Sequence, residues 1–188
     1  MLDKELYIIG ASGLGKEILA TLKSSGFLKQ YSFIGFIDNF EGVVNGIPIV
    51  GRNEFLTGLK KESDVLLAIG SPVVRKRILD QLLKYRHLNF ITYVHPGASI
   101  YDSETIKIGR GCYIGENSIL TTDIIVEDFC FLNINVSLHH DTIIRENSVL
   151  MPGVIITGGA EIGKNSYLGN NFQISDKVKI PENSLLKL

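Results

Sequence analysis

Aliphatic residues recur at every sixth position through the second half of the chain, without interruption. They are Ile108, Ile114, Leu120, Val126, Leu132, Leu138, Ile144, Leu150, Ile156, Ile162, Leu168, Ile174 and Ile180. Four positions after each comes a second residue, which is small in most repeats and bulky at Ile124 and Phe172. A period of six fits neither an α-helix nor an alternating strand, but it is typical of a hexapeptide β-helix.

Each six-residue repeat predicts one short strand and a corner, with the aliphatic side chain pointing into the interior. Such coils bury their core only by stacking. The pattern resembles the left-handed β-helix of the hexapeptide acyltransferases, in which three repeats close one triangular coil. Residues 18 apart would then lie above one another, at about 4.8 Å per coil. Cys112 and Cys130 are 18 apart, both in the small inward position. We interpret them as core residues rather than as redox or metal-binding groups.

The first half of the chain has a different pattern, in which short apolar strands alternate with helical stretches. Strands are predicted at 6–9, 33–37 and 64–69, and helices at 16–25 and 72–85. This order predicts a parallel sheet with crossover connections. Residues 87–94 also have a strand-like pattern. We therefore expect a Rossmann-like α/β domain over residues 1–90 and a β-helix domain over residues 91–188.

A glycine-rich turn follows the first predicted strand and leads directly into a helix. A strand, such a turn and a helix N-terminus together can hold a phosphate, because free backbone N–H groups and the helix dipole face the anion. Asp38 ends the second strand, where a nucleotide site of this type places an acceptor for ribose or base. The candidate substrate-binding residues are Gly10, Ser12, Gly13, Gly15, Asp38, Asn39 and Gly70.

Other interpretations of this turn remain open. The glycines follow the order G-x-x-G-x-G and not the dinucleotide pattern G-x-G-x-x-G, so a nicotinamide-dependent oxidoreductase has weak support. Glu17 occupies the position at which a P-loop needs Ser or Thr, which argues against ATP hydrolysis. The segment could also be a tight turn without a ligand, and Asp38 a turn residue before Asn39.

Composition narrows the function further. Hydrophobic residues make up 45% of the chain and charged residues 21%, which is enough to build a sizeable core. A net charge of −1 gives no reason to expect nucleic acid or an anionic membrane as a partner. Two cysteines and no long apolar run or signal-peptide pattern lead us to expect a soluble, cytoplasmic protein.

Four histidines are the candidates for a general base. His87 lies in the segment between the halves, and His95 precedes a proline and is interpreted as structural. His139 and His140 follow the inward Leu138, so at least one should project from the coil. Imidazole accepts a proton near neutral pH, and a neighbouring carboxylate such as Asp141 can orient it.

The glycine-rich α/β unit, the Phe-Ile-Asp strand end, the His-Pro junction and the hexapeptide coils occur together in one known group. The chain resembles the sugar O- and N-acyltransferases of the sialic acid O-acetyltransferase and bacillosamine N-acetyltransferase family, over nearly its whole length. The resemblance implies that the first domain holds the nucleotide of an activated sugar, and that the protein acts on a nucleotide sugar or sialic acid. It also implies acetyl-CoA as acyl donor without a metal, bound at a subunit boundary of a homotrimer.

The resemblance also suggests catalytic residues. The segment Leu138-His-His-Asp resembles the family's catalytic His-Asp step, with the match on His140 and Asp141. Gly158 follows His140 by 18 residues and should lie one coil above it, and the family's oxyanion glycine falls at the same place. Together with Gly159 it would let the thioester of CoA approach the backbone closely.

One alternative of another class remains. The chain ends at Leu188, short of the Gly-Val-Pro-Ala-Lys-like tail that helps to enclose coenzyme A in the family. A sugar-nucleotide-binding or scaffolding trimer without transferase activity would fit this difference. The sequence also leaves open whether nitrogen or oxygen is acylated, and on which sugar.

Overall fold

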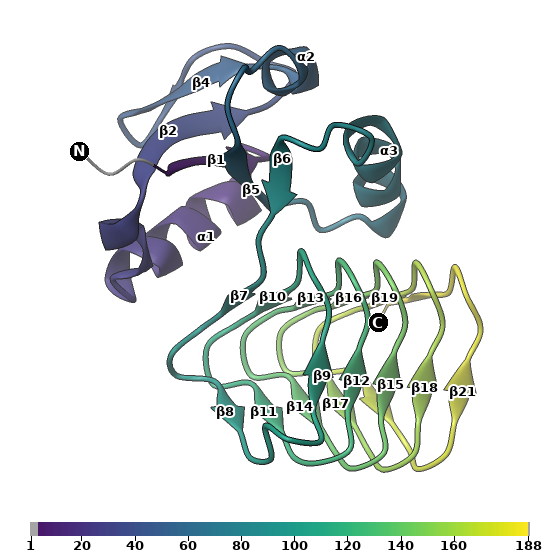
Figure 1. Ribbon diagram of the computed structural model, residues 1–188. Coiled ribbons are helices and arrows are strands. Elements are labelled where there is room, and N and C mark those ends of the chain that lie inside the picture. Colours follow the sequence, from purple (N-terminus) through teal and green to yellow (C-terminus); the bar gives the residue numbers. More distant parts are fainter. Residues whose placement is uncertain (1–3, 188) are drawn as a thin grey trace. The chain divides into compact units, whose positions relative to one another are not determined.

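The chain forms two units, shown in Figure 1. The first comprises the residues up to Gly70 together with Val74–Ile91, and the second comprises Ser71–Val73 and the residues from Thr92 onward. The computed structural model describes residues 4–187. The predicted fold class, an α/β domain followed by a left-handed parallel β-helix of hexapeptide repeats, is confirmed.

The first unit is built on a six-stranded sheet in the order β3-β4-β2-β1-β5-β6. All neighbouring strands run parallel except the β3–β4 pair. The strands are β1 (Glu5–Ile9), β2 (Ser32–Ile37), β3 (Val43–Val44), β4 (Ile47–Gly51), β5 (Ser63–Leu67) and β6 (Leu88–Phe90). The helices are α1 (Gly13–Ser24), η1 (Phe27–Gln30), α2 (Asn53–Thr57) and α3 (Pro72–Leu82). Because β2 and β5 lie on opposite sides of β1, a ligand crevice is expected beyond the carboxyl ends of these three strands.

Most predicted elements have shifted boundaries; the third strand, predicted over 64–69, ends at Leu67 in β5. Helix α1 begins at Gly13 and not at Lys16, because Ser12 is the extended residue before the first turn, with φ −77° and ψ −163°. Helix α3 ends at Leu82. The segment 87–94 is two strands, β6 and β7 (Tyr93–Val94), because the backbone changes partner: Ile91 N–H donates to Val65, whereas Tyr93 N–H donates to Cys112.

The β-helix consists of two-residue strands that stack into three parallel sheets. One sheet has the order β22-β19-β16-β13-β10-β7, the second β20-β17-β14-β11-β8 and the third β21-β18-β15-β12-β9. The remaining strands are β8 (Ser99–Ile100), β9 (Lys107–Ile108), β10 (Tyr113–Ile114), β11 (Ile119–Leu120), β12 (Ile125–Val126), β13 (Phe131–Leu132), β14 (Ser137–Leu138), β15 (Ile143–Ile144), β16 (Val149–Leu150), β17 (Ile155–Ile156), β18 (Glu161–Ile162), β19 (Tyr167–Leu168), β20 (Gln173–Ile174), β21 (Lys179–Ile180) and β22 (Leu185–Leu186).

The repeat determines the core of this unit. Neighbouring strands of a sheet pair residues 18 apart, as in Leu120 with Leu138, so the aliphatic positions stack as predicted. Those of the central coils are fully buried. The interpretation of the cysteines is also confirmed: Cys112 and Cys130 are buried as free thiols in the same core cluster, and each thiol donates to a backbone carbonyl.

Most corners of the β-helix turn through a residue with positive φ. The non-glycine residues there are Asn117, Asp123, Phe129, Asn135, Asp141, Asn147, Asn165, Asn171, Lys177 and Asn183, with φ between 53° and 60°. Asn and Asp tolerate this left-handed conformation better than other side chains apart from glycine. Corner geometry therefore explains why Asn or Asp recurs at the turns between strands. Asp141 occupies one of these turns.

Candidate active site

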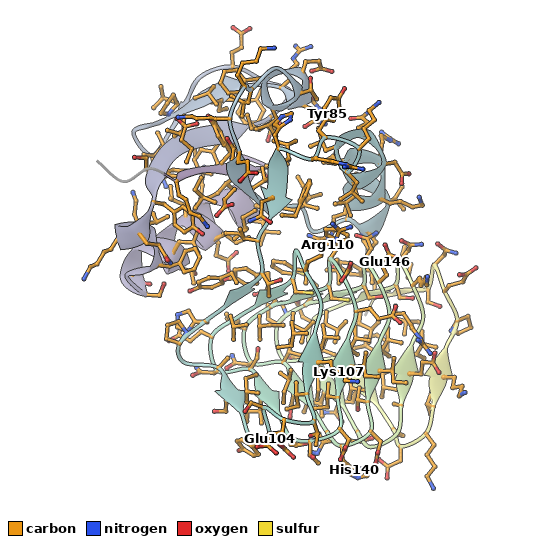
Figure 2. All side chains as sticks on the ribbon, viewed as in Figure 1. Tyr85, Glu104, Lys107, Arg110, His140 and Glu146 are labelled. Atoms are coloured by element: carbon orange, nitrogen blue, oxygen red, sulfur yellow. The ribbon has the colours of Figure 1, made fainter. Side chains whose placement is uncertain are left out.

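His140 and Asp141 form the corner between strands β14 and β15. His140 is exposed at the edge of the coil, as Figure 2 shows. Asp141 is the left-handed residue of the turn, with φ 60°. Its N–H donates to Thr122 of the preceding coil, which anchors the turn. The rigid stack of coils therefore holds the backbone of both residues, while both side chains reach solvent.

The two side chains are joined to each other. His140 Nδ1 lies 2.8 Å from Asp141 Oδ2, and the side chains remain 63% and 67% exposed. Since a carboxylate only accepts hydrogen bonds, Nδ1 carries the proton of this contact. The Nε2 atom is then the basic position of the neutral imidazole. This arrangement suits a general base whose ring orientation is set by a carboxylate.

Gly158 lies in the coil after His140, at the equivalent corner. A Cβ atom at this position would overlap His140 Cε1 and Nε2, so the ring packs directly on the glycine. Gly159 N–H donates to the His140 carbonyl at 2.9 Å, and Lys177 N–H donates to the Gly158 carbonyl at 2.9 Å. Within residues 4–187, the Gly158 N–H has no backbone acceptor. An uncommitted amide therefore lies beside the imidazole, as an oxyanion donor requires.

The other three histidines have different surroundings. His139 is half-buried, and its Nε2 lies 3.4 Å from Ser137 Oγ. His95 Nδ1 accepts the Gly97 N–H at 2.9 Å, which closes a turn. His87 Nε2 lies 3.0 Å from the Leu56 carbonyl, to which it donates. Of the four, His140 alone combines an exposed ring with a carboxylate partner.

A second candidate site lies in the first unit, at the carboxyl ends of β1, β2 and β5. A cleft of about 290 Å³ is found there. It is lined by Ile9, Gly10, Ile37, Asp38, Asn39, Asn53, Glu54, Ile69, Val74, Arg77, Ile78 and Gln81. Of the predicted substrate-binding residues, Gly10, Asp38 and Asn39 belong to this lining, whereas Ser12, Gly13, Gly15 and Gly70 do not.

The glycine-rich turn has two separate structural requirements. Gly10 adopts φ 104°, and a Cβ there would meet the Ala68 carbonyl. A Cβ on Gly15 would overlap the Gly10 carbonyl, so this glycine lets α1 pack against the end of β1. Gly13, by contrast, faces open space. The Ser12 side chain makes no capping hydrogen bond, which leaves the first N–H groups of α1 available to a ligand.

Asp38 has a clear structural role. One carboxylate oxygen accepts the Ala11 N–H at 2.7 Å, and the other accepts the Asn39 N–H at 2.7 Å. The side chain therefore ties the end of β2 to the glycine-rich turn after β1. A carboxylate oxygen has a second lone pair, so these bonds leave acceptor capacity toward the cleft.

Four polar residues of the cleft were missed from the sequence: Asn53, Glu54, Arg77 and Gln81. The first two begin α2, a short helix that the sequence pattern did not predict. The last two lie on α3, with Val74 and Ile78, at positions 74, 77, 78 and 81. This spacing defines one face of a helix, so the sequence pattern could have predicted that these four side chains line the same surface.

Among residues 4–187, no group of three or more His, Cys, Asp or Glu side chains is placed to hold a metal ion. No helix in the described part of the chain is long and apolar enough to cross a membrane.

Stacked hexapeptide coils, joined to an α/β unit with a cleft at its strand ends, are the architecture of hexapeptide-repeat acyltransferases. Residues 5–82 match the PglD N-terminal domain family, and residues 141–171 match the bacterial transferase hexapeptide family with its six repeats. Together with the structural match to the PglB domain described next, they confirm the predicted resemblance to the sugar O- and N-acyltransferases.

Solved structures share this architecture. The acetyltransferase domain of PglB from Neisseria gonorrhoeae, in complex with acetyl coenzyme A, is 25% identical, with a TM-score of 0.85 over 97% of this chain and 87% of that one. A mutant of perosamine N-acetyltransferase from Caulobacter crescentus, in complex with CoA and GDP-perosamine, is 21% identical, with a TM-score of 0.86 over 97% and 85%. WeeI from Acinetobacter baumannii AYE is 22% identical, with a TM-score of 0.75 over 97% and 95%. The latter two likenesses support the fold alone.

A curated relative matches much of the chain. The bifunctional protein GlmU of Alkaliphilus oremlandii is 26% identical over 169 residues, which is 88% of this chain. The matched region is 36% of that protein, so the chain spans only about a third of the length of this relative.

Proposed function

We propose that this protein transfers the acetyl group of acetyl-CoA to an amino or hydroxyl group of a nucleotide-activated sugar, with His140 as general base. The observation that carries the proposal is the His140–Asp141 pair packed on Gly158, in a coil corner open to solvent. A trimer that only binds or scaffolds would not need this arrangement of base, carboxylate and free amide.

The chemistry follows from the atoms present. The acceptor nitrogen or oxygen attacks the thioester carbonyl and gives its proton to His140 Nε2, while Asp141 holds the proton on Nδ1 and stabilises the imidazolium. The C–S bond of the tetrahedral intermediate then breaks. The CoA thiolate leaves with the proton from Nε2, which restores the neutral imidazole. No acyl-enzyme forms, and no step requires a metal.

Gly158 has two roles in this proposal. Its N–H donates to the oxyanion of the tetrahedral intermediate, and the absence of a side chain leaves room for the imidazole. Gly159 follows at the left-handed turn position, with φ 69°. Two consecutive glycines let the thioester of CoA approach the backbone more closely than any side chain would permit.

The acyl donor and the acceptor are inferred from relatives and from the first unit. The PglB domain binds acetyl-CoA, which supports acetyl-CoA as the acyl donor here. The perosamine enzyme, which shares the fold, binds CoA with a nucleotide sugar, and the cleft of the first unit in this chain suits a nucleotide of that kind. We assign nucleotide binding to residues 1–90, with Gly10, Asp38 and Asn39 in the cleft and with Ser12, Gly13, Gly15 and Gly70 beside the N-terminus of α1. Acyl transfer is assigned to residues 91–188.

We also propose a homotrimer, in which neighbouring β-helices complete the acetyl-CoA site. On one face of the β-helix, the paired outward residues Ile125 and Ile143 are partly exposed aliphatic side chains in neighbouring coils. Aliphatic side chains on a flat outer face are suited to contact with another subunit.

The test is acetyl-CoA turnover by the whole protein. Purified enzyme is incubated with acetyl-CoA and a panel of nucleotide amino sugars and nucleotide sugars, and free CoA thiol is measured over time. Thiol release that depends on one acceptor supports the proposal. Saturable nucleotide-sugar binding, without thiol release from any acceptor and without acetyl-CoA binding in a calorimeter, would instead support the non-catalytic trimer.

A further inference from the structure

The cleft of the first unit combines aliphatic surfaces with a short polar row. Ile9 and Ile37 form part of its floor as buried residues, and Ile69, Val74 and Ile78 add further apolar contact. Such surfaces suit a flat, largely apolar ring system whose polar edge must find partners elsewhere. The polar row, formed by Gln81, Asn53 and Glu54, supplies those partners.

Two members of the row are fixed against each other. Asn53 Nδ2 donates to Gln81 Oε1 at 2.9 Å, which joins the start of α2 to the last turn of α3. This bond uses the oxygen of Gln81 and one N–H of Asn53. It leaves Gln81 Nε2 as a donor and Asn53 Oδ1 as an acceptor, on two neighbouring side chains of the cleft lining.

Glu54 extends the row by one more acceptor. It follows Asn53 directly in α2, and its carboxylate makes no ion pair or side-chain hydrogen bond to any residue in the described part of the chain. A carboxylate at pH 7 accepts hydrogen bonds only. The row therefore presents a donor at Gln81, an acceptor at Asn53 and a second acceptor at Glu54.

We propose that this row reads the edge of a guanine base, so that the activated sugar is a guanosine diphosphate derivative. Guanine presents O6 as an acceptor, N1–H as a donor and the N2 amino group as a donor, in that order. Each matches one member of the row: O6 with Gln81, N1–H with Asn53 and the amino group with Glu54. The inference rests on the proposed function, since it specifies the nucleotide of the same acceptor substrate.

The other bases fit this row less well. Uracil would present O2 to Glu54, which places two acceptors against each other and leaves the carboxylate unpaired. Cytosine would present its N3 acceptor to Asn53 Oδ1 when its amino group faces Glu54. Adenine can satisfy two positions but lacks the third donor. An unsatisfied or repelled polar group costs more than a missing contact, which makes the row selective.

Arg77 adds a charge that suits a nucleotide ligand. It lies one helical turn before Gln81 on the cleft-lining face of α3, and its guanidinium has no ion-pair partner among residues 4–187. Guanidinium groups are well suited to phosphate oxygens. The cleft thus offers a cation for the diphosphate as well as a row for the base.

The experiment compares GDP and UDP binding to the full chain by calorimetry. We expect GDP to bind at least about tenfold more tightly than UDP. The guanine amino group would donate a charge-assisted hydrogen bond to Glu54, whereas uracil O2 would be repelled by the same carboxylate. In Glu54→Ala, GDP affinity should fall about tenfold while UDP affinity should rise, because the repulsion between the carboxylate and uracil O2 is removed. The matched control is Glu62→Ala. Glu62 is an exposed carboxylate just before the first residue of β5, at the amino ends of the strands and away from the cleft at their carboxyl ends, so both affinities should stay unchanged.

The outcomes separate this inference from the proposed function. Tighter binding of UDP than of GDP, or equal loss of both in a folded Glu54→Ala protein, overturns the guanine inference and leaves nucleotide-sugar acetylation standing. If neither nucleotide binds at millimolar concentration, the inference fails together with the nucleotide part of the proposed function. Thiol release from acetyl-CoA with sugars that carry no nucleotide would then test the transfer activity on its own.

Discussion

The imidazole of His140 packs so closely on Gly158 that a single methyl group at that glycine would occupy the space of ring atoms Cε1 and Nε2. The two residues are one coil apart, and the backbone of each is held by hydrogen bonds between coils. The position of the proposed base therefore depends on the lack of a side chain in the next coil. This dependence can be tested separately from the oxyanion role of the Gly158 N–H.

The first prediction concerns Gly158→Ala. The substitution keeps the N–H but forces the His140 ring away from its place, so we expect turnover to fall by about a hundredfold or more, the usual contribution of a positioned base. Gly158 does not have positive φ, so the fold should tolerate alanine. Gly58→Ala is the control, because a Cβ there meets only ordinary contacts beyond 3.5 Å and should change neither turnover nor stability. Normal turnover in Gly158→Ala would contradict the close packing.

A second prediction separates two glycines of the first unit. Gly15→Ala would press a methyl group into the Gly10 carbonyl and should destabilise the protein by about 1–3 kcal/mol. Gly13→Ala faces open space at the start of α1 and should stabilise it by about 0.5–1 kcal/mol. Urea unfolding of both variants measures the difference. Equal midpoints for the two variants would show that α1 does not pack on the turn in this way.

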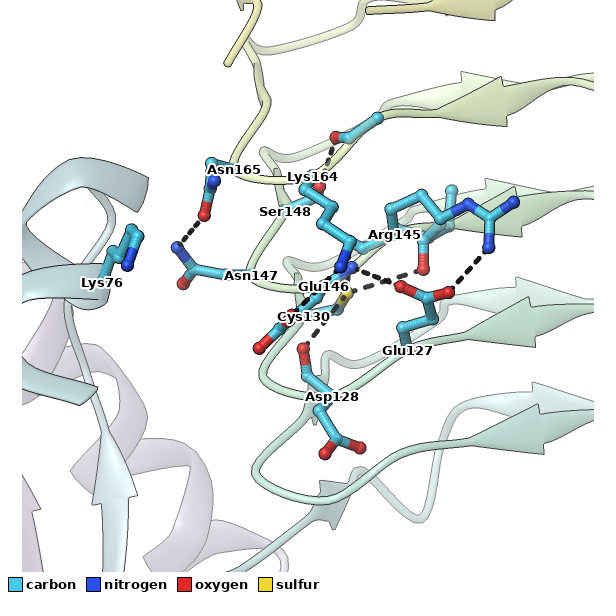
Figure 3. Close-up of polar contacts among 12 residues, drawn as sticks. Lys76, Glu127, Asp128, Cys130, Arg145, Glu146, Asn147, Ser148, Lys164 and Asn165 are labelled. Atoms are coloured by element: carbon cyan, nitrogen blue, oxygen red, sulfur yellow. Dashed lines mark hydrogen bonds and ion pairs between the residues drawn. The ribbon is translucent and has the colours of Figure 1, made fainter. Parts of the chain in front are cut away.

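The third prediction concerns three charged side chains in successive coils of the β-helix, Glu127, Arg145 and Glu161, which we call the charge ladder. Figure 3 shows its contact between Arg145 and Glu127. Arg145 lies 2.8 Å from Glu127 and 2.6 Å from Glu161. Burial works to raise the pKa of Glu127, but hydrogen bonds from Arg145 and from the Glu146 N–H outweigh it and lower that pKa from its ordinary value. The Arg145 hydrogen bond likewise holds the pKa of Glu161 below its ordinary value.

The pH dependence follows from these directions. A carboxyl group with a lowered pKa in the folded state stabilises the fold above its ordinary pKa, and the contribution is lost as pH falls through the folded-state value. Arg145→Met should therefore lower stability by on the order of 1 kcal/mol at pH 7, or roughly 2–4 °C in Tm. The difference from wild type should shrink below about pH 4.

Thermal unfolding from pH 7 to pH 3 checks this expectation. Lys164→Met serves as the comparison, because its 3.6 Å contact with Glu146 joins two more exposed side chains and should contribute less. A constant difference between wild type and Arg145→Met across this pH range would show that the ladder does not act through these carboxylates.

The β-helix was the most predictable part of the molecule. A strict six-residue period determines which side chain points into the core in every strand, so the inward positions from Ile108 to Ile180 follow from the pattern alone. Three repeats per coil also predict that Gly158 lies next to His140, because the two residues are 18 apart. The contact between the ring and the glycine backbone was not predictable, because it depends on a rotamer that no repeat specifies.

The first unit was less predictable. Strands β3 and β4 form a hairpin across Asn45 and Gly46, both with positive φ. An Asn-Gly pair between apolar residues is a usable hairpin signal. The cleft itself could not be predicted, because it arises where strand ends meet the faces of α2 and α3, and single-element patterns do not show which faces converge. Asp38 illustrates the difficulty, since its position matches a ligand acceptor while its carboxylate also closes the turn.

The most direct test of the account is the rate of thiol release by His140→Ala beside wild type and His139→Ala. We expect His140→Ala to stay folded and to lose about 10²- to 10⁴-fold in turnover, because among the four histidines only His140 is an exposed imidazole with a carboxylate partner. His139→Ala should retain most of its activity, since its side chain contacts Ser137 and not Asp141. Turnover of His140→Ala at the wild-type rate would contradict the assignment of the general base.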